Sequence, residues 1–237
     1  MRVAIHQPAY LPYPGFFHKL SMADVFVIMD DVQYDKRFTN RNRILVPQGP
    51  IWISVPIVKS DKFQPNALVE INNSIDWRPE HLKKIRNSYA NAPFFHLYQD
   101  YLRSVYSRDW ELLFDLDFEL VKAVANWLGI RIPMLRESEL KVTGTATDRL
   151  VNTCKAVGAD TYISGSGGKN YLDEGSFSKN GLRVVYQNYR PFPYRQRFTT
   201  SFVPDLSIID MLSNLGPDCM KAACAEAPDA QTALLTV

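Results

Sequence analysis

The 237-residue sequence contains only three cysteines, Cys154, Cys219 and Cys224, and none of them form a CxxC pair. An odd number without that spacing argues against a disulfide framework and against a cysteine-based zinc site. The four histidines form no HxH or HxxxH pair, so no metal site is predicted from them either. This cysteine usage is typical of a reducing compartment, and we expect a cytoplasmic protein.

Long apolar runs and a strong net charge are also missing. No stretch approaches the roughly 18 consecutive apolar residues of a membrane span, and no signal peptide is predicted at the start. With 27 Lys and Arg against 25 Asp and Glu, the formal net charge is +2, which gives no reason to expect nucleic acid as a partner. Because 46% of the residues are hydrophobic, the chain can bury a substantial core, and any basic site must be local.

Short apolar runs alternate with helical patterns along much of the chain. Residues 2–5 and 25–29 are compact and β-branched, which is typical of buried strands, and residues 15–23 between them have helical spacing. This unit resembles a right-handed βαβ crossover, whose ligands gather at the carboxyl ends of the parallel strands. Further strands are predicted at 51–58, 131–136, 161–164 and 181–189, and helices at 78–90, 93–106, 110–128, 147–157, from about 171, and at 206–216.

The order of these elements predicts the domain organisation. Strands alternate with helices at both ends of the chain, whereas the segment at about 76–128 is almost entirely helical. We therefore expect a single α/β domain over residues 1–216, with a parallel Rossmann-like sheet and a helical insertion at about 76–128. Residues 217–237 are rich in small residues and are predicted to be a weakly ordered tail.

The first cluster of polar residues follows the strand at residues 2–5, in a loop stiffened by prolines. His6 is a candidate general acid or base, because histidine is the side chain that ordinarily titrates near neutral pH. Lys19, on the predicted helix that follows, is placed to neutralise an anion. The alternative is a structural histidine at a strand end and a lysine that only faces solvent. The substrate-binding candidates of this cluster are Gln7, Tyr10 and Tyr13.

The second cluster follows the strand at residues 25–29. Asp30 is expected at the same sheet edge as His6, and we take it as the third catalytic candidate. Arg41 lies between two asparagines, and its forked guanidinium suits a carboxylate or a phosphate. The alternative is a solvated loop, since charged runs usually face water. The binding candidates here are Asp31, Tyr34, Lys36, Arg37, Asn40, Arg41 and Asn42, with Trp52 on the next predicted strand.

The third cluster is the sequence ISGSGGKNYLD, a glycine-rich turn between a predicted strand and a short helix. Such turns let a backbone approach a phosphate closely. A Walker loop would need glycine at Ile163 and the dinucleotide fingerprint would need glycine at Asn170, so neither template matches, and a plain tight turn is the alternative. The ligand-contact candidates are Ser164, Gly165, Ser166, Gly167, Gly168, Lys169 and Tyr171. Tyr194 and Gln196 lie in a later segment that we expect to close over the site.

Several short motifs together resemble the WbqC-like family over nearly the whole chain. They are HQP at 6–8, YLP at 10–12, GFF at 15–17, Lys19, the aspartate pair 30–31 and NRN at 40–42. The chain departs from the expected pattern at Tyr13-Pro14, where a tryptophan-like aromatic and a small residue are expected. This departure changes the shape expected for one wall of the pocket.

The resemblance implies work on surface polysaccharides such as the O-antigen of lipopolysaccharide, with a nucleotide-activated or lipid-linked sugar as partner. On that basis we expect an amide-forming acyl or aminoacyl transferase that acts on an amino sugar, with His6 as the base. Arg41 and Lys19 would hold a diphosphate or a carboxylate. No cofactor is firmly implied, and acyl-coenzyme A or ATP would be a co-substrate. The sequence leaves homo-oligomer formation open.

Two alternatives remain at this point. The strand, histidine loop, helix and strand at the start are similar to nucleotidyltransferases and adenylate-forming ligases of the HIGH type, which use histidines and a lysine against the transferring phosphate. The second histidine of that signature is missing from its expected place, unless His18 or Lys19 substitutes for it. The other alternative is a protein that binds a sugar nucleotide without turning it over.

Overall fold

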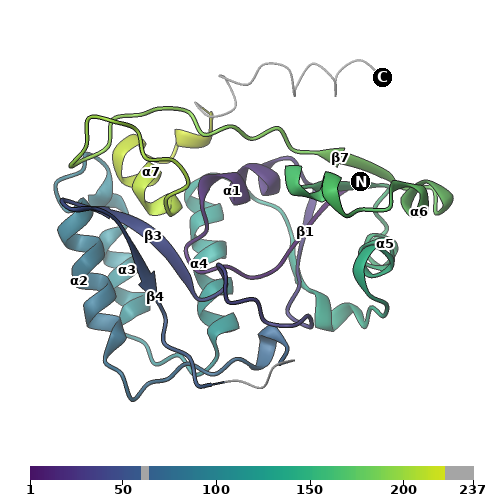
Figure 1. Cartoon of the computed structure of the whole chain (residues 1–237), viewed down its shortest axis with the longest axis horizontal. Coiled ribbons are helices and arrows are strands. Elements are labelled where there is room, and N and C mark those ends of the chain that lie inside the picture. The colour runs from purple at the N-terminus through teal and green to yellow at the C-terminus, as the bar shows by residue number, and fades with distance from the viewer. Residues whose placement is uncertain (60–63, 222–237) are drawn as a thin grey trace.

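A computed structural model describes residues 1–59 and 64–221 of the chain (Figure 1). Within them, a five-stranded sheet has the order β5-β2-β1-β6-β7, and all four strand pairs of this sheet are parallel. The predicted α/β class with a parallel sheet is therefore confirmed. Renumbered along the chain, the order reads 3-2-1-4-5, which is the order of doubly wound sheets. The strands are β1 (Arg2–His6), β2 (Val25–Ile28), β5 (Met134–Arg136), β6 (Thr161–Ser164) and β7 (Arg183–Tyr186).

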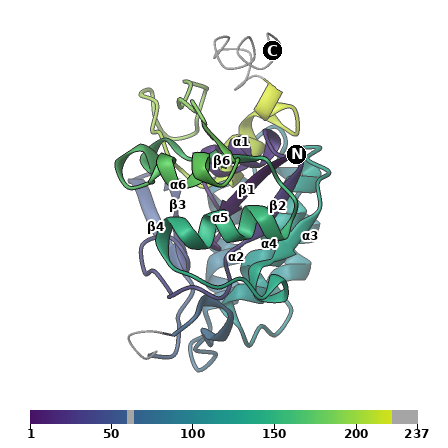
Figure 2. The same cartoon turned by 90° about the vertical axis from the view of Figure 1, so that its right-hand side faces the viewer.

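Different helices cover the two faces of this sheet (Figure 2). Because successive side chains of a strand point to opposite faces, Val3 and Ile5 of β1 belong to one cluster of buried residues, whereas Ala4 between them belongs to the other. The first cluster contains residues of α5 (Ala146–Ala156) and α6 (Glu174–Lys179). The second and larger cluster contains residues of α1 (Pro14–Ser21), α4 (Leu113–Trp127) and α7 (Ile208–Leu215).

The segment between β2 and β5 adds a hairpin and helices beside the sheet (Figure 1). The hairpin consists of β3 (Arg41–Val46) and β4 (Gly49–Ser54), which pair antiparallel. Two further helices, α2 (Trp77–Tyr89) and α3 (Gln99–Tyr106), precede α4. In the described residues, no helix is long and apolar enough to cross a membrane.

The structure corrects several predicted boundaries. Strand β3 was missed, because its first residues are Arg, Asn and Arg, and these read as a polar loop. The predicted strand 51–58 ends at Ser54, two residues before Pro56, which has no backbone N–H for a strand partner. The predicted helix at 93–106 divides into a 3-10 turn, η2 (Phe95–Leu97), and α3.

The end of the described chain is packed rather than loose. Cys219 and Met220 are buried in the larger cluster, although they belong to the segment predicted as a tail. The rest of that prediction, residues 222–237 with Cys224, lies outside the described residues.

Candidate functional site

Three polar segments meet at the carboxyl ends of β1, β2 and β6. β1 pairs with β2 on one side and with β6 on the other, so the residues that follow these strands share one edge of the sheet. The chain extends the sheet outward from β1 in one direction through β2 and β5, and in the other through β6 and β7. Ligands of open α/β sheets bind at this kind of switch point. His6 and the glycine-rich turn lie on its two sides.

His6 is the last residue of β1, and its ring is oriented by one hydrogen bond. Nδ1 lies 2.8 Å from the carbonyl oxygen of Gln7, so Nδ1 carries the proton as the donor and Nε2 holds the free lone pair. The ring packs edge-on against Phe16, with 4.8 Å between the ring centres. Burial, and then the charge of Lys19, lower the pKa of His6 to about 3. The imidazole is therefore neutral at neutral pH, with its lone pair on Nε2. With a pKa this low it is a weak base, and a bound substrate must raise the pKa for His6 to accept a proton efficiently.

Lys19 of α1 lies beneath the loop that follows β1. It is only 3% exposed, and its Nζ donates a 2.8 Å hydrogen bond to the carbonyl oxygen of Ile5. Burial lowers the pKa of this amine to about 7. The charged and neutral forms of Lys19 are therefore both populated near neutral pH, and a small change in its surroundings changes its charge.

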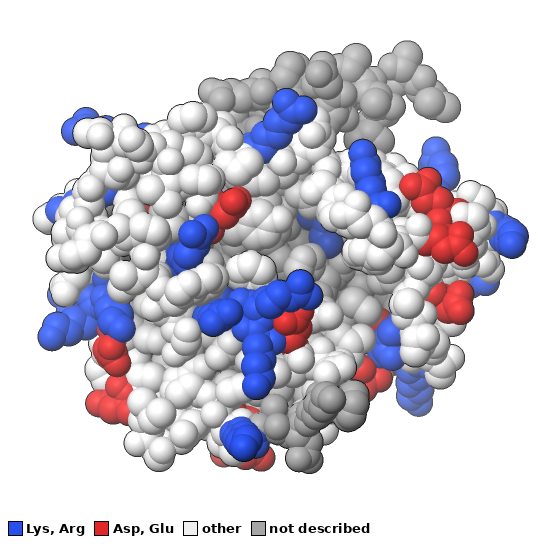
Figure 3. All heavy atoms as spheres, viewed as in Figure 1, with Lys and Arg blue, Asp and Glu red and all other residues white. Residues whose placement is uncertain are grey.

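A cavity of about 760 Å³ opens at this edge of the sheet, and we call it the carboxyl-edge cavity. Its volume suits a cofactor-sized or substrate-sized molecule. In Figure 3, Lys and Arg side chains gather near the centre of the face shown, beside a hollow in the surface. Of the predicted site residues, those that line the cavity are His6, Gln7, Tyr13, Lys19, Arg37, Gly165, Ser166, Gly167, Gly168 and Tyr171.

The glycine-rich turn forms one wall of this cavity. It continues as a 3-10 turn, η4 (Ser166–Asn170), which begins with a hydrogen bond from the Gly168 N–H to the carbonyl oxygen of Gly165. Gly168 is buried, and a Cβ at this position would collide with the Ser164 hydroxyl. Only glycine therefore fits there. The predicted short helix from Tyr171 instead begins at Glu174, after an Asp173 cap.

The first turn of α5 forms another wall, which no local sequence pattern indicates. Ala146 and Arg149 line the cavity, and no side chain caps the start of the helix. Arg149 is fixed by Glu137, whose carboxylate accepts 2.9 and 3.0 Å bonds from it, and by Asp31 at 3.1 Å. Because Glu137 and Asp31 already accept from Nε and Nη2 of Arg149, the N–H groups that remain for an anion at this wall are those of Nη1 and of the helix start.

The chain matches the model of the WbqC-like protein family over residues 7–222. The chain belongs to this family. It is also similar to the uncharacterized protein Rv1507c of Mycobacterium tuberculosis, with 32% identity over 230 residues that cover 96% of each chain. No solved structure matches the chain.

In this WbqC-like protein, Asp30 does not line the cavity. It is fully buried, and its carboxylate accepts a 3.1 Å bond from Arg136 Nε and bonds of 2.9 and 2.6 Å from the Ser138 N–H and hydroxyl. These partners follow from the pairing of β2 with β5. The geometry thus corrects the catalytic role predicted for Asp30 to a structural one, which joins the ends of two strands.

We expect Asp30→Asn to destabilise the fold. An amide NH₂ would face one of the donors that the carboxylate now accepts, so the free energy of unfolding should fall by about 3 kcal/mol and the Tm by about 9 °C. Thermal unfolding by circular dichroism measures this, with Asp100→Asn on the exposed face of α3 as a control that should change little. An unchanged Tm for Asp30→Asn together with lost activity would restore the catalytic role.

The asparagines of the NRN motif support the backbone. Asn40 donates a 2.9 Å bond to the carbonyl oxygen of Val55, and Asn42 donates a 2.7 Å bond to that of Leu11. Both residues therefore hold the hairpin and the loop after β1 in place. Neither lines the carboxyl-edge cavity.

Arg41 and Trp52 lie on the hairpin surface outside the cavity. The guanidinium carbon of Arg41 is 4.7 Å from the centre of the Trp52 ring, and Trp52 is 44% exposed. Phe38 connects the two regions, because it lines the cavity and its ring centre is 6.2 Å from that of Trp52. Lys36 and Asp31 are exposed and do not line the cavity.

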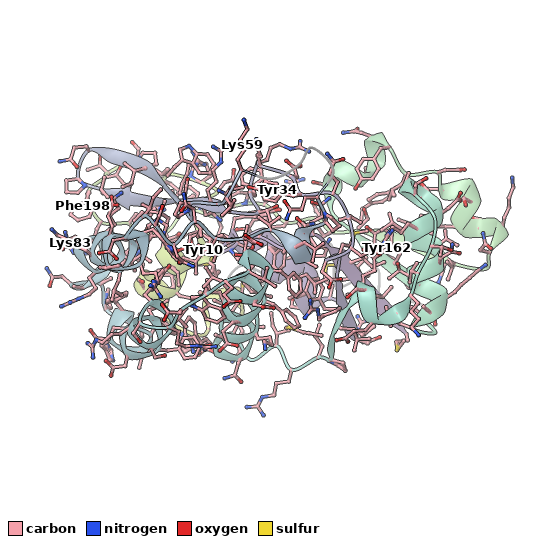
Figure 4. All side chains as sticks on the ribbon, turned by 90° about the horizontal axis from the view of Figure 1, so that it is seen from below. Tyr10, Tyr34, Lys59, Lys83, Tyr162 and Phe198 are labelled. Atoms are coloured by element: carbon pink, nitrogen blue, oxygen red, sulfur yellow. The ribbon has the colours of Figure 1, made fainter. Side chains whose placement is uncertain are left out.

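Tyr10 and Tyr34, which were predicted to bind substrate, also lie away from the cavity lining. Tyr10 is fully buried, and its hydroxyl contacts the Nδ1 of His81 at 2.9 Å and the hydroxyl of Tyr106. These partners come from α2 and α3, so Tyr10 connects the helical segment to the loop after β1. Tyr34 is half-buried in the loop after β2. Figure 4 labels both tyrosines.

The remaining predicted residues divide between two places. Ser164 is buried behind the glycine-rich turn, where its hydroxyl donates to the carbonyl oxygen of Gly165, and exposed Lys169 lies over the ring of Tyr186. Tyr194 and Gln196 do not close over the carboxyl-edge cavity. Both residues bond to Asp210 of α7, and they line a different cavity beside that helix.

Proposed function

We propose that this WbqC-like protein is a transferase that forms an amide by moving an acyl or aminoacyl group onto the amine of an amino sugar. The proposal is supported by the position of His6, whose Nδ1 bonds to the Gln7 carbonyl oxygen and leaves the Nε2 lone pair free in a cavity that also contains the buried Lys19. A base and a cation at one switch point are what acyl transfer to an amine requires. The amino sugar is proposed to be nucleotide-activated or lipid-linked.

The transfer needs one proton acceptor and one donor to the developing oxyanion. The amine nitrogen attacks the carbonyl carbon of a thioester, and His6 Nε2 takes the proton that the nitrogen loses. The charged form of Lys19 stabilises the oxyanion of the tetrahedral intermediate. When the carbon–sulfur bond breaks, the proton passes from His6 to the departing thiolate, which leaves as the free thiol.

The walls of the cavity support a donor that carries phosphate, such as acyl-coenzyme A. Arg149 and the uncapped start of α5 provide N–H donors on one side, and the backbone of the glycine-rich turn provides them on the other. Tyr13, Phe38 and Tyr171 are exposed aromatic rings at the lining, where they offer surfaces for a sugar or a base.

A direct test is incubation of the purified protein with acyl-coenzyme A and with UDP- or dTDP-linked amino sugars. We expect mass spectrometry to detect an acylated sugar nucleotide and an equal amount of free thiol. Release of thiol without an acylated sugar, or no reaction with any acyl donor, contradicts the proposal.

Gly15→Ala tests the role of Tyr13 in this cavity. A Cβ at position 15 would overlap the Tyr13 ring, which is the flexible end of a side chain that is 37% exposed. The ring must therefore leave its place at the cavity wall while the fold persists. We expect the KM for the sugar to rise about 5-fold with a Tm change below about 2 °C, and Tyr13→Ala to raise the KM similarly. An unchanged KM in both variants would remove Tyr13 from the site.

A second candidate function is formation of an adenylate from ATP and a carboxylic acid, as in ligases of the HIGH type. The 3-2-1-4-5 strand order and the phosphate-suited walls around Lys19 and Arg149 favour it. In that reaction, a carboxylate oxygen attacks the α-phosphorus and pyrophosphate leaves. Exchange of labelled pyrophosphate into ATP that depends on an added acid would select this candidate, whereas transfer from acyl-coenzyme A without ATP would reject it.

A further inference from the structure

A second cavity, of about 930 Å³, lies apart from the carboxyl-edge cavity. Residues 194–202 form most of its wall, so we call it the loop cavity. The two cavities have no lining residue in common. Figure 4 places Phe198 of the loop cavity near one end of the molecule, well away from Tyr162 of the carboxyl-edge cavity. A molecule in the loop cavity would therefore occupy a separate site.

The loop that forms this wall is held in a defined conformation. The Tyr194 hydroxyl and the Gln196 amide donate bonds of 2.7 and 3.0 Å to Oδ2 of Asp210, which is fully buried in α7. The same Gln196 side chain accepts a 2.8 Å bond from the Val203 N–H and donates one of 3.0 Å to its carbonyl oxygen. Asp210 thus holds the start of the loop, and Gln196 joins the start to Val203 at its end. The cavity wall is therefore preorganised.

The lining of the loop cavity is cationic. Arg195 and Arg197 both contribute to it, whereas no Asp or Glu among the described residues does. Arg197 donates a 3.3 Å bond to the carbonyl oxygen of Ser88, which orients the side chain and leaves further N–H donors. The amide side chains of Asn91 and Asn214 also line the cavity. Two guanidinium groups without a lining carboxylate are suited to an anion with several oxygens, such as phosphate.

Phe198 adds an aromatic ring to this cationic lining. Its φ of +65° is in the left-handed region, which is rare for a bulky residue. The ring is 39% exposed, and the Arg197 guanidinium carbon lies 4.7 Å from its centre. The loop thus holds an aromatic ring at the surface beside the Arg197 guanidinium.

We infer that the loop cavity binds a nucleoside phosphate, with the phosphate on Arg195 and Arg197 and the base against Phe198. The volume is sufficient for a molecule of that size. Cation and ring together select this class, since the arginines alone would bind any phosphate and the ring alone would bind any base. This inference is independent of the transferase proposal, because it concerns different residues.

Titration calorimetry with UMP and AMP tests the inference, with ribose 5-phosphate and uridine as ligands that lack the base or the phosphate. Arg195→Ala/Arg197→Ala should weaken nucleotide binding at least about 30-fold. Phe198→Ala should weaken it about 10-fold but leave ribose 5-phosphate unchanged. Arg190→Ala is the matched control, because Arg190 is an exposed arginine that does not line the cavity. Lys83→Met, an exposed lysine of α2 that lines neither cavity, should bind the nucleotide like the wild type.

Several outcomes would overturn the inference. These are the absence of nucleotide binding at millimolar concentration, binding that the double arginine variant retains at the wild-type affinity and stoichiometry, and a complete loss of binding in Lys19→Met, which would place the nucleotide in the carboxyl-edge cavity. If the double variant does not fold, Arg195→Glu replaces it, because Arg195 is exposed and the reversed charge should abolish binding on its own. Nucleotide binding to Arg195→Glu at wild-type affinity would equally contradict the inference.

Discussion

His6→Asn should lower the kcat for amide formation by about 1000-fold, because the loss of a positioned base costs on the order of 10² to 10⁴ in rate. Asparagine is the matched replacement, since its NH₂ group can still donate to the carbonyl oxygen of Gln7, as Nδ1 does now. It lacks a nitrogen that could accept a proton. The Tm at neutral pH should therefore remain close to that of the wild type.

The same variant should make the fold less sensitive to acid. The native pKa of His6 is about 3, below its ordinary value of 6.5, so the unfolded chain binds more protons between these two values. The stability that neutral His6 contributes is present above pH 6.5 and is lost as the pH falls toward 3, by about 1.4 kcal/mol for each unit. His6→Asn removes this proton linkage.

Steady-state kinetics and unfolding at several pH values measure both effects, with His96→Asn as the control, because His96 is exposed and lies in neither cavity. A His6→Asn variant that keeps more than about a tenth of the activity would exclude His6 as the base.

Lys19→Met should stabilise the fold and at the same time lower the activity about 100-fold. The pKa of Lys19 falls from 10.5 in the unfolded chain to about 7 in the native state. The unfolded chain therefore binds more protons between pH 7 and 10.5, and stability rises with pH through that range. Below pH 7, holding the charged amine in the fold costs about 5 kcal/mol by this linkage.

Methionine removes that cost, but it also removes the hydrogen bond to the carbonyl oxygen of Ile5. After this loss, we expect a net gain of about 2 kcal/mol at pH 6, which corresponds to a Tm about 5 °C higher. The activity falls because the oxyanion loses its cation. In the wild type, kcat/KM should decline as the pH rises above about 7, since Lys19 then loses its charge.

Unfolding and kinetics at pH 6, 7 and 8 test these statements, with Lys83→Met on the surface of α2 as the control. A lower Tm for Lys19→Met at pH 6 would show that the buried amine is not a cost to the fold. A wild-type kcat/KM that rises through pH 7 would show that neutral Lys19 is the active form.

That His6 and the glycine-rich turn each follow a strand could be predicted from the sequence, whereas the pairing of β1 with β6, which brings them together, could not. Short apolar strands ended at His6 and at Ser164, and parallel neighbours in an α/β sheet end at one edge. The helix between the first two strands placed Lys19 beneath that edge. Local patterns were sufficient for these positions along the chain, because each residue lies within or directly after the element that positions it.

The roles of Arg149, Asp30 and Tyr10 could not be predicted in the same way. Arg149 reaches the cavity only because the sheet order places the start of α5 beside β1, and that order is not visible in the local pattern. The Asp30 carboxylate accepts hydrogen bonds from Arg136 of β5 and from Ser138 just after it, which lie more than a hundred residues later in the chain. Tyr10 is buried because partners on α2 and α3 satisfy its hydroxyl.

Thermal unfolding with ATP, coenzyme A, acyl-coenzyme A and UDP- or dTDP-amino sugars tests whether the active site lies at the carboxyl edge of the sheet. Arg195→Glu is compared with Arg195→Glu/Lys19→Met, so that nucleotides do not bind in the loop cavity of either protein. A ligand bound only by the native state at 100 times its Kd adds about 2.7 kcal/mol of stability. We predict that at least one acyl donor or sugar nucleotide raises the Tm of Arg195→Glu and that Arg195→Glu/Lys19→Met loses most of this rise. A rise of equal size in both proteins would contradict the placement of the active site at the carboxyl edge of the sheet.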